Sequence, residues 1–292
     1  MLSDTHCHIF SYYDDDALKA ILPEAVRSLN FIQDIGTKPD DFSARFAKAK
    51  NFFANDAEAL HTELPECLRF SLGIWPDAEY IATPDHSLAL LEENLVKAIG
   101  MGLKPALGEC GLDRYWNGAN AEKKAGAAGS HGTTDVAGEE FLFEQQLLLA
   151  KKYSLPVIVH SREAFADTLK VIDKAGYHNG VIHCYSYGID EVAPFLERGW
   201  YISFSGNCTF ATTQTKKLKT AALVQAVPLE KMLLETDAPY LAPAPHRGET
   251  NSPLWVRYVY ERVGEILVLD GDTLSGIIFE NANKLFGTLA KK

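Results

Sequence analysis

The chain has 292 residues, of which 47% are hydrophobic, and its formal net charge is −11. This length and composition allow a large buried core, and no run of about 18 apolar residues predicts a membrane span. The acidic balance argues against a broad basic surface for nucleic acid, although a small site could still contact phosphate through metal ions.

The amino-terminal residues and the cysteines bear on the location of the protein. Asp4, His6 and His8 stand where a signal peptide would be apolar, so a cytoplasmic location is expected. The five cysteines are odd in number, widely spaced and without a C-x-x-C pair. They predict reduced thiols, and neither a disulfide framework nor a cysteine zinc site.

Short apolar segments alternate along the chain with longer segments of helical periodicity. The predicted strands are residues 2–8, 27–33, 68–74, 103–109, 155–161, 180–185, 199–205 and 231–237. The predicted helices, which have apolar residues at three- and four-residue spacing, are residues 40–55, 86–102, 139–154, 162–176, 189–199 and 253–267.

This alternation predicts an α/β protein, a TIM-type (β/α)8 barrel that forms one domain over residues 1–292. An open doubly wound sheet is the alternative, but it usually has a Gly-rich phosphate loop after its first strand, where this chain has HCHIFSYYDDD. Residues 117–140 interrupt the rhythm, because they are rich in Gly and Ala and lack apolar periodicity. They predict a long surface loop, either a lid over the active face or an inert insertion.

Two histidines in the first predicted strand suggest a metal site. Side chains alternate across a strand, so His6 and His8 share a face and are close enough to chelate one ion, or else they are hydrogen-bonded core histidines. Polar residues also end other apolar strands, at the edge where a barrel gathers its catalytic groups. They are Glu109, His160, His183 and Asp237. Four imidazoles and two carboxylates could hold two divalent ions, Mg, Mn or Zn.

Several ordered motifs resemble one family of enzymes. They are SDTHCH, GECGLDRY, FEQQLLLAKKYSLPVIVHSREAF, HCYSYG and ETDAPYLAPAPHRGETNSP, followed by NANKLFG in the last helix. These motifs resemble the TatD family of metal-dependent deoxyribonucleases in the amidohydrolase superfamily. The resemblance implies a TIM barrel and a metal-dependent hydrolase that cleaves phosphodiester bonds in DNA, often exonucleolytically. Attack of a metal-held water on phosphorus would require no covalent enzyme intermediate.

The resemblance also assigns roles to the candidate residues. His6, His8 and Asp237 would bind one metal, His160 and His183 the other, and Glu109 would bridge the two. Asp237 would also accept a proton from the attacking water, so Asp237 and Glu109 are the expected catalytic residues. DNA would be contacted mainly through phosphate at the metals, without a membrane or an obligate protein partner.

The chain departs from the family pattern at three places, which affect substrate binding. Trp75 in LGIWP replaces an expected histidine, the loop at about residues 117–140 is unusually long, and residues 12–68 are atypical. Trp75 could stack on a base or pack on the barrel rim. The family pattern places Arg162 and Arg247 near the active face, where a guanidinium could bind phosphate or form a surface salt bridge.

Other interpretations of the sequence remain open. The same ligand set could hydrolyse a small amide, ester or lactone, or the metal site could be structural in a non-catalytic barrel. Glu109 could instead form a buried ion pair, with Arg114 as the nearest candidate. The remaining histidines outside the motifs are expected to face solvent or to lie satisfied in the core: His61, His86, His131 and His178.

Overall fold

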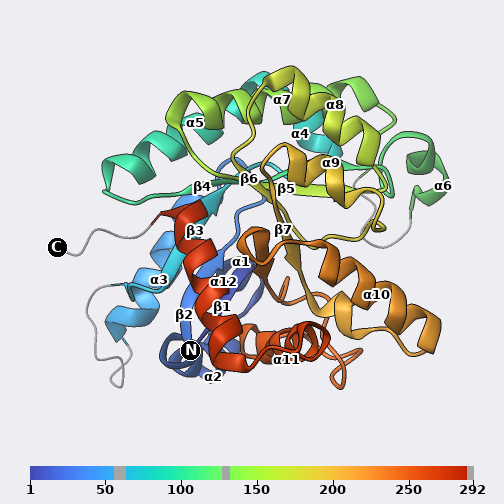
Figure 1. Cartoon of the computed structure of the whole chain (residues 1–292). Helices are drawn as coiled ribbons and strands as arrows, with labels where there is room; N and C mark the ends of the chain where they lie inside the picture. The colour runs from blue at the N-terminus through green and yellow to red at the C-terminus, as the bar shows by residue number, and fades with distance from the viewer. Residues whose placement is uncertain (56–63, 127–131, 288–292) are drawn as a thin grey trace.

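Eight parallel strands form one sheet that curves into a barrel in the computed structural model of the chain (Figure 1). Neighbouring strands pair in chain order. They are β1 (Leu2–Cys7), β2 (Leu29–Asp34), β3 (Leu68–Leu72), β4 (Ala106–Asp113), β5 (Val157–Arg162), β6 (Gly180–Ile182), β7 (Tyr201–Phe204) and β8 (Met232–Leu234). The structure describes residues 1–55, 64–126 and 132–287.

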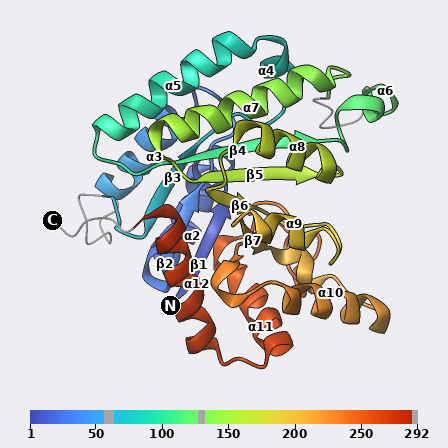
Figure 2. The same ribbon diagram turned by 45° about the horizontal axis from the view of Figure 1, so that its top comes forward.

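Helices surround the strands on the outside of the barrel (Figures 1 and 2). They are α1 (Ile9–Tyr12), α2 (Asp15–Ser28), α3 (Phe42–Asn55), α4 (Ala78–Ala82), α5 (Pro84–Gly100), α6 (Ala121–Lys124), α7 (Val136–Tyr153), α8 (Phe165–Ala175), α9 (Val192–Glu197), α10 (Gln214–Ala226), α11 (Val256–Leu267) and α12 (Gly271–Phe286). Figure 2 shows β4 and β5 beneath α5 and α7. The predicted TIM-type barrel is confirmed, and no described helix is long and apolar enough to cross a membrane.

Every predicted strand and helix overlaps an observed one, but the sequence analysis missed the short helices α1, α4 and α6 and the longer helices α2 and α10. Helix α2 carries a signal that could have predicted it. The Asp14 side chain accepts a hydrogen bond from the backbone of Ala17 at its start, and Leu18, Leu22 and Ala25 are buried along one face. Helix α10 is less amphipathic, and Val224 is its one buried residue. Its sequence therefore gave little periodic signal.

An apolar cluster of strand side chains packs against the end of α12. Phe31 of β2, Ile158 of β5 and Leu233 of β8 belong to this cluster. Leu285 and Phe286 at the end of α12 join this cluster, and the Phe286 ring lies 5.6 Å from that of Phe31. The predicted ligands lie at the carboxyl end of the strands, where a parallel barrel gathers its active-site residues.

Two strands change their pairing register close to the predicted metal ligands. Leu107 pairs with Val157 but Cys110 with Val159, so β4 has one extra residue at Gly108 and Glu109. A similar shift lies between Asp4 and Cys7 in β1. Bulges of this kind commonly redirect a side chain next to an active site. The prediction that Glu109 ends the fourth strand was wrong, because pairing with β5 continues as far as Asp113.

The barrel closes between β1 and β8 next to the predicted ligands. The backbone N–H of Asp237 donates to His6 O at 2.9 Å, and that of His8 donates to Ala238 O at 2.7 Å. Strand β8 itself ends at Leu234, three residues before Asp237, so Asp237 lies on the segment that follows the strand. These two hydrogen bonds bring His6, His8 and Asp237 to the same point of the barrel.

The prediction that residues 117–140 form a loop is partly wrong. A short 3-10 turn at Gly118–Asn120 and helix α6 lie within it, and α7 begins at Val136 because the Asp135 side chain accepts a hydrogen bond from Gly138 N. Buried Asn117 ties both described ends together through Thr133 N and the Glu139 side chain. Residues 127–131 of this prediction lie outside the described residues.

A buried ion pair supports the loop that carries His8. Arg45 contacts the Asp34 carboxylate, and both side chains are almost completely buried. The other oxygen of Asp34 accepts hydrogen bonds from the backbone of Ile9 and Phe10 at 2.9 and 3.0 Å. Asp34 at the end of β2 therefore fixes the backbone directly after His8, and Arg45 neutralises it.

Replacing Arg45 by Met is expected to lower the free energy of unfolding by about 3–5 kcal/mol, because it leaves Asp34 buried and unpaired. Burial already raises the pKa of Asp34, and Arg45 opposes this rise. A carboxyl group with a raised pKa makes the folded protein less stable as pH rises. The loss of unfolding free energy in the Arg45 variant should therefore be smaller at about pH 5 than at pH 7. Urea unfolding at both pH values measures it.

The matched control for this prediction is Arg27→Met, which removes an exposed pair with Glu24 on α2 and should hardly change stability. If the free energy of unfolding falls no more in the Arg45 variant than in this control, the Arg45–Asp34 pair contributes little to stability.

Candidate metal centre and active site

Every predicted ligand lies at the carboxyl end of the barrel. His6 lies in β1 and His8 directly after it, Glu109 and His160 lie in β4 and β5, and His183 and Asp237 follow β6 and β8. His6, His8, Glu109 and His183 are buried, whereas His160 and Asp237 are in part exposed. Residues that are up to 231 positions apart in the chain therefore meet at one site.

Glu109 stands at the centre of this site, and its two oxygens face different histidines. Oε1 lies 3.0 Å from His160 Nδ1 and 3.0 Å from His183 Nε2. Oε2 lies 3.4 Å from His6 Nε2 and 3.6 Å from His8 Nε2. The carboxylate therefore separates the four imidazoles into two pairs.

Each pair forms, together with Glu109, a group that could hold a metal ion. The ligand atoms of His6, His8 and Glu109 lie within 4.8 Å of one another, as do those of Glu109, His160 and His183. Asp237 Oδ1 lies 3.6 Å from His6 Nε2 and 3.5 Å from His8 Nε2, so it faces the first group. The expectation that His6 and His8 point to a common place is confirmed, because their Nε2 atoms are 3.3 Å apart.

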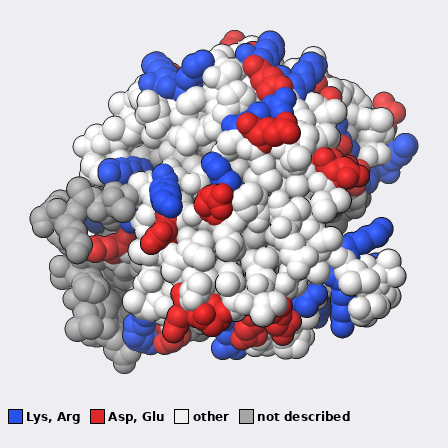
Figure 3. Space-filling view, in the orientation of Figure 1, with Lys and Arg blue, Asp and Glu red and all other residues white. Residues whose placement is uncertain are grey.

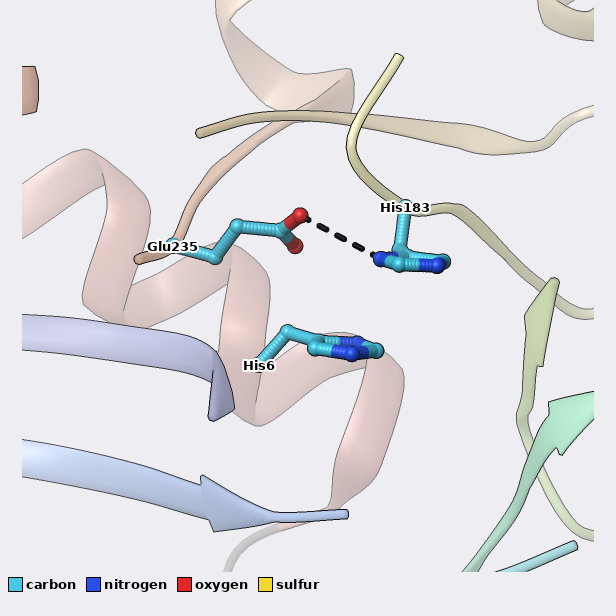
Figure 4. A group of neighbouring side chains, drawn as sticks. All are labelled: His6, His183 and Glu235. Atoms are coloured by element: carbon cyan, nitrogen blue, oxygen red, sulfur yellow. Dashed lines mark ion pairs between the residues drawn. The ribbon is translucent and has the colours of Figure 1, made fainter. Parts of the chain in front are cut away.

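A third such group contains a residue that the sequence analysis missed, Glu235 (Figure 4). The rings of His6 and His183 are stacked with centroids 3.9 Å apart, and Glu235 Oε1 lies 3.4 Å from His183 Nδ1. The carboxylate also accepts hydrogen bonds from Ser203 Oγ and from the backbone of Cys184. Glu235 therefore supports His183 from the side away from Glu109, in the way that carboxylates orient ligating histidines.

Asp113 has the same relation to His160 and was also missed. Its Oδ2 lies 2.9 Å from His160 Nε2, while Oδ1 accepts a hydrogen bond from Trp116 N. Gly111, two residues before Asp113, packs closely against the backbone of β5, because a Cβ there would overlap the carbonyl oxygen of His160. Asp113 belongs to the motif GECGLDRY. A carboxylate four residues after Glu109 at the end of the same strand could therefore have been predicted to support a ligating histidine.

The electrostatics of the site follow from burying carboxylates among imidazoles. Burial raises the pKa of Glu109, but His183, His160 and His6 outweigh this effect and hold it well below its usual range. Burial lowers the pKa of His160, but Asp113 and Glu109 raise it overall to about 9. For His6 burial dominates, and together with the charge of His183 it lowers the pKa. The imidazoles are thus not equivalent.

The predicted substrate-binding residues lie at different distances from this centre. The Trp75 ring meets the His160 ring at 5.6 Å, edge to face, so Trp75 belongs to the site. Exposed Arg162 stacks on Tyr115, with its guanidinium carbon 3.7 Å from the ring centroid. Exposed Arg247 stacks in the same way on Phe210 at 3.6 Å. The charge of Arg162 also helps to hold the pKa of Asp113 below its usual range.

Arg114 does not contact Glu109, so the alternative ion pair for Glu109 is wrong. Arg114 instead pairs with Glu139, and with Asp167 at 2.9 Å. His86 and His178 are exposed, as expected, whereas His61 and His131 lie outside the described residues.

The comparison with protein families identifies the family of the chain. The profile of the TatD related DNase family matches residues 3–287. The chain therefore belongs to the TatD related DNase family. The resemblance of its sequence motifs and the predicted enzyme class, a metal-dependent hydrolase, are confirmed.

Several bacterial relatives of this TatD-family protein carry related names. The uncharacterized metal-dependent hydrolase YabD of Bacillus subtilis (strain 168) is 30% identical over 70% of this chain and 74% of its own length. The uncharacterized metal-dependent hydrolase YcfH of Escherichia coli (strain K12) is 37% identical over 62% of each chain. The 3'-5' ssDNA/RNA exonuclease TatD of Citrobacter rodentium (strain ICC168) is 31% identical over 64% of this chain and 66% of its own length.

Solved structures of the family share the barrel. A TatD homologue from Escherichia coli K12 matches with a TM-score of 0.76 and 25% identity, covering 98% of this chain and 97% of its own. A TatD-family hydrolase from Entamoeba histolytica has a TM-score of 0.72 and 19% identity, over 98% and 97% of the two chains. The second comparison supports the fold.

Proposed function

We propose that this TatD-family protein is a deoxyribonuclease that hydrolyses phosphodiester bonds at a dinuclear metal site and removes nucleotides from a strand end. The observation that supports this most directly is Glu109, whose two oxygens face two separate pairs of histidines at 3.0–3.6 Å. Relatives named 3'-5' ssDNA/RNA exonuclease support a nucleic-acid substrate. A two-metal site suits phosphodiester hydrolysis, because both the attacking and the leaving oxygen need stabilisation.

The donor set fits two divalent ions. The ion-pair partners of Glu109 in the described part of the chain are four imidazoles, with no Lys or Arg among them. In this proposal His6, His8 and Asp237 hold one ion, His160 and His183 the other, and Glu109 holds both. When bound, the ions would polarise the phosphate and lower the pKa of a water molecule. Imidazole and carboxylate ligands suit Mg, Mn or Zn in different measure.

The side chains around the ions would position the substrate and move one proton. Asp237 is the partly exposed carboxylate of the group, with 13% of its side chain accessible, so it can reach both His8 and an attacking water. It would accept the proton of that water. Arg162, Arg247 and Trp75 would bind the strand, the arginines through phosphate and Trp75 through a base.

Metal binding should release protons. The pKa of His160 is raised to about 9, so at pH 7 its imidazole is protonated in the metal-free protein, whereas a ligating nitrogen must be free. Affinity should therefore increase by about tenfold per pH unit for each proton released, and metal should dissociate on acidification. Calorimetric titration at pH 7 in two buffers of different ionisation enthalpy counts the protons.

The control for the proton count is His178→Ala, because His178 is exposed and should not alter it. Binding without proton release, or full metal occupancy at about pH 4.5, would contradict a histidine-rich site.

The decisive experiment for the function is an assay of the purified protein with added Mg²⁺, Mn²⁺ or Zn²⁺. The substrates are single-stranded DNA, double-stranded DNA, RNA and a panel of small amides, esters and lactones. We expect stepwise shortening of DNA that depends on the added metal. Turnover of the small compounds without cleavage of nucleic acid would contradict the proposal and favour the amidohydrolase alternative. A cytoplasmic location stays a prediction.

A further inference from the structure

Two exposed tyrosines stand beside the candidate metal centre, and the proposed chemistry gives neither of them a role. Tyr12, the last residue of α1, is 51% exposed, and Tyr240, three residues after Asp237, is 47% exposed. Their rings meet edge to face with centroids 5.6 Å apart. Both rings also contact the His8 ring, at 5.6 and 6.0 Å. The pair therefore forms part of the rim next to a ligating imidazole.

The backbone beneath both tyrosines is held in place. Tyr240 N donates to Asp237 O at 2.8 Å, and Asn251 Nδ2 donates to Tyr240 O. On the other side the neighbour of Tyr12, Tyr13, is buried, and its hydroxyl donates to Asn251 O. Asn251 thus links the two segments that carry the tyrosines. The backbone that carries both rings is therefore fixed, which lowers the entropic cost of binding a flat ligand.

The environment of the pair indicates what it would bind. The two rings are nearly perpendicular, and about half of each side chain is accessible to solvent. Exposed aromatic faces next to a phosphate site are the elements that proteins use to hold single-stranded nucleic acid, through stacking on bases. His8 presents Nε2 to Glu109 and its ring to the tyrosines, so one imidazole separates the phosphate site from the pair.

We infer that Tyr12 and Tyr240 form a stacking platform for the base of the nucleotide whose phosphate lies at the metal centre. This inference rests on the proposed nuclease function. It adds that the enzyme recognises a base beside the scissile phosphate as well as the phosphate itself. The platform positions the substrate and takes no part in the chemistry. Stacking is tolerant of sequence, so all four bases should be accepted.

The test compares two single-stranded DNA oligonucleotides of equal length. One is ordinary, and the other has abasic tetrahydrofuran residues at the last three positions of each end. Cleavage rates are measured for the parental protein and for Tyr12→Ala, Tyr240→Ala, Tyr12→Phe and Tyr240→Phe. Phe141→Ala is the matched control, since Phe141 is an exposed aromatic residue, 41% accessible, on the outer helix α7.

We expect each Ala variant to raise KM on the ordinary oligonucleotide about tenfold, with a smaller change in kcat, because stacking contributes about 1–3 kcal/mol per base. The Phe variants keep a ring and should restore the parental KM. On the abasic oligonucleotide the parental KM should already be raised, and the Ala substitutions should add no further increase. Circular dichroism and thermal unfolding confirm that the variants are folded.

The outcomes separate the inference from the function on which it rests. Parental cleavage with unchanged KM in the Ala variants, or an equal rise of KM on both oligonucleotides, would overturn the platform and leave the nuclease function standing. A parental protein that cleaves neither oligonucleotide with any of the three metals would overturn the proposed function, and the platform with it.

Discussion

Replacing Glu109 by Gln is expected to keep the barrel folded and to abolish the paired metal site. Gln has nearly the same shape, but its amide offers only one good oxygen, whereas Glu109 presents Oε1 to one histidine pair and Oε2 to the other. A shared anion also reduces the repulsion between two nearby cations. Hydrolysis should fall about a thousandfold or more, because metal stabilisation contributes several kcal/mol and about 1.4 kcal/mol corresponds to a tenfold change.

Metal content, thermal unfolding and nuclease rate should be measured on one preparation of this variant. Glu261→Gln, an exposed residue of α11, is the matched control and should resemble the parent in all three. A Glu109 variant that still binds two ions and cleaves DNA at nearly the parental rate would refute the bridging role. If the metal-free Glu109 variant is unfolded, the main role of Glu109 is in stability.

Replacing Asp237 by Asn should lower kcat by about 100-fold to 10,000-fold, the usual contribution of a general base. Asp237 has a positive φ of 57°, and Asn tolerates this left-handed conformation well, so the backbone hydrogen bond to His6 O should persist. The amide cannot accept the proton of a water molecule. The loss should therefore appear in turnover, with a nearly unchanged melting temperature.

Metal analysis separates the two roles of Asp237. Retention of both ions with lost turnover supports the proton-accepting role, whereas loss of one ion shows that its main role is ligation. Asp190→Asn, an exposed residue, controls for the change of charge. If the turnover of the Asp237 variant is within about threefold of the parental value, both roles are contradicted, because loss of a general base lowers turnover by at least about 100-fold.

The surface charge agrees with a substrate contact that is concentrated at the site. Acidic and basic side chains are interspersed over the face in Figure 3, and no continuous basic surface crosses the described part of that face. If the protein acts on DNA as proposed, Lys and Arg of this face would neutralise few phosphates, and binding would depend mainly on the metal centre and its rim. Asp113 and Glu235 add two carboxylates near the ligands, which makes the site itself less positive than the six predicted ligands imply.

The sequence by itself determined the architecture and the family, and it singled out the candidate ligands. Apolar runs and helical periodicity are local properties, so all eight strands and the six listed helices could be predicted. The candidate ligands could be recognised because His and carboxylate residues stand near the carboxyl ends of apolar strands. His160 lies two residues before the end of β5, and His183 directly follows β6. Parallel strands bring those ends to one edge of a barrel whatever their separation in the chain.

Only the tertiary structure decided which side chains face each other. The register shift at Gly108 and Glu109 turns that carboxylate toward four histidines, and no local pattern specifies a bulge. Glu235 and Asp113 support His183 and His160 from strands far away in sequence, and Tyr12 meets Tyr240 across 228 positions. Such contacts depend on the register and closure of the whole barrel, because a shift of one residue would turn every side chain of a strand to its other face.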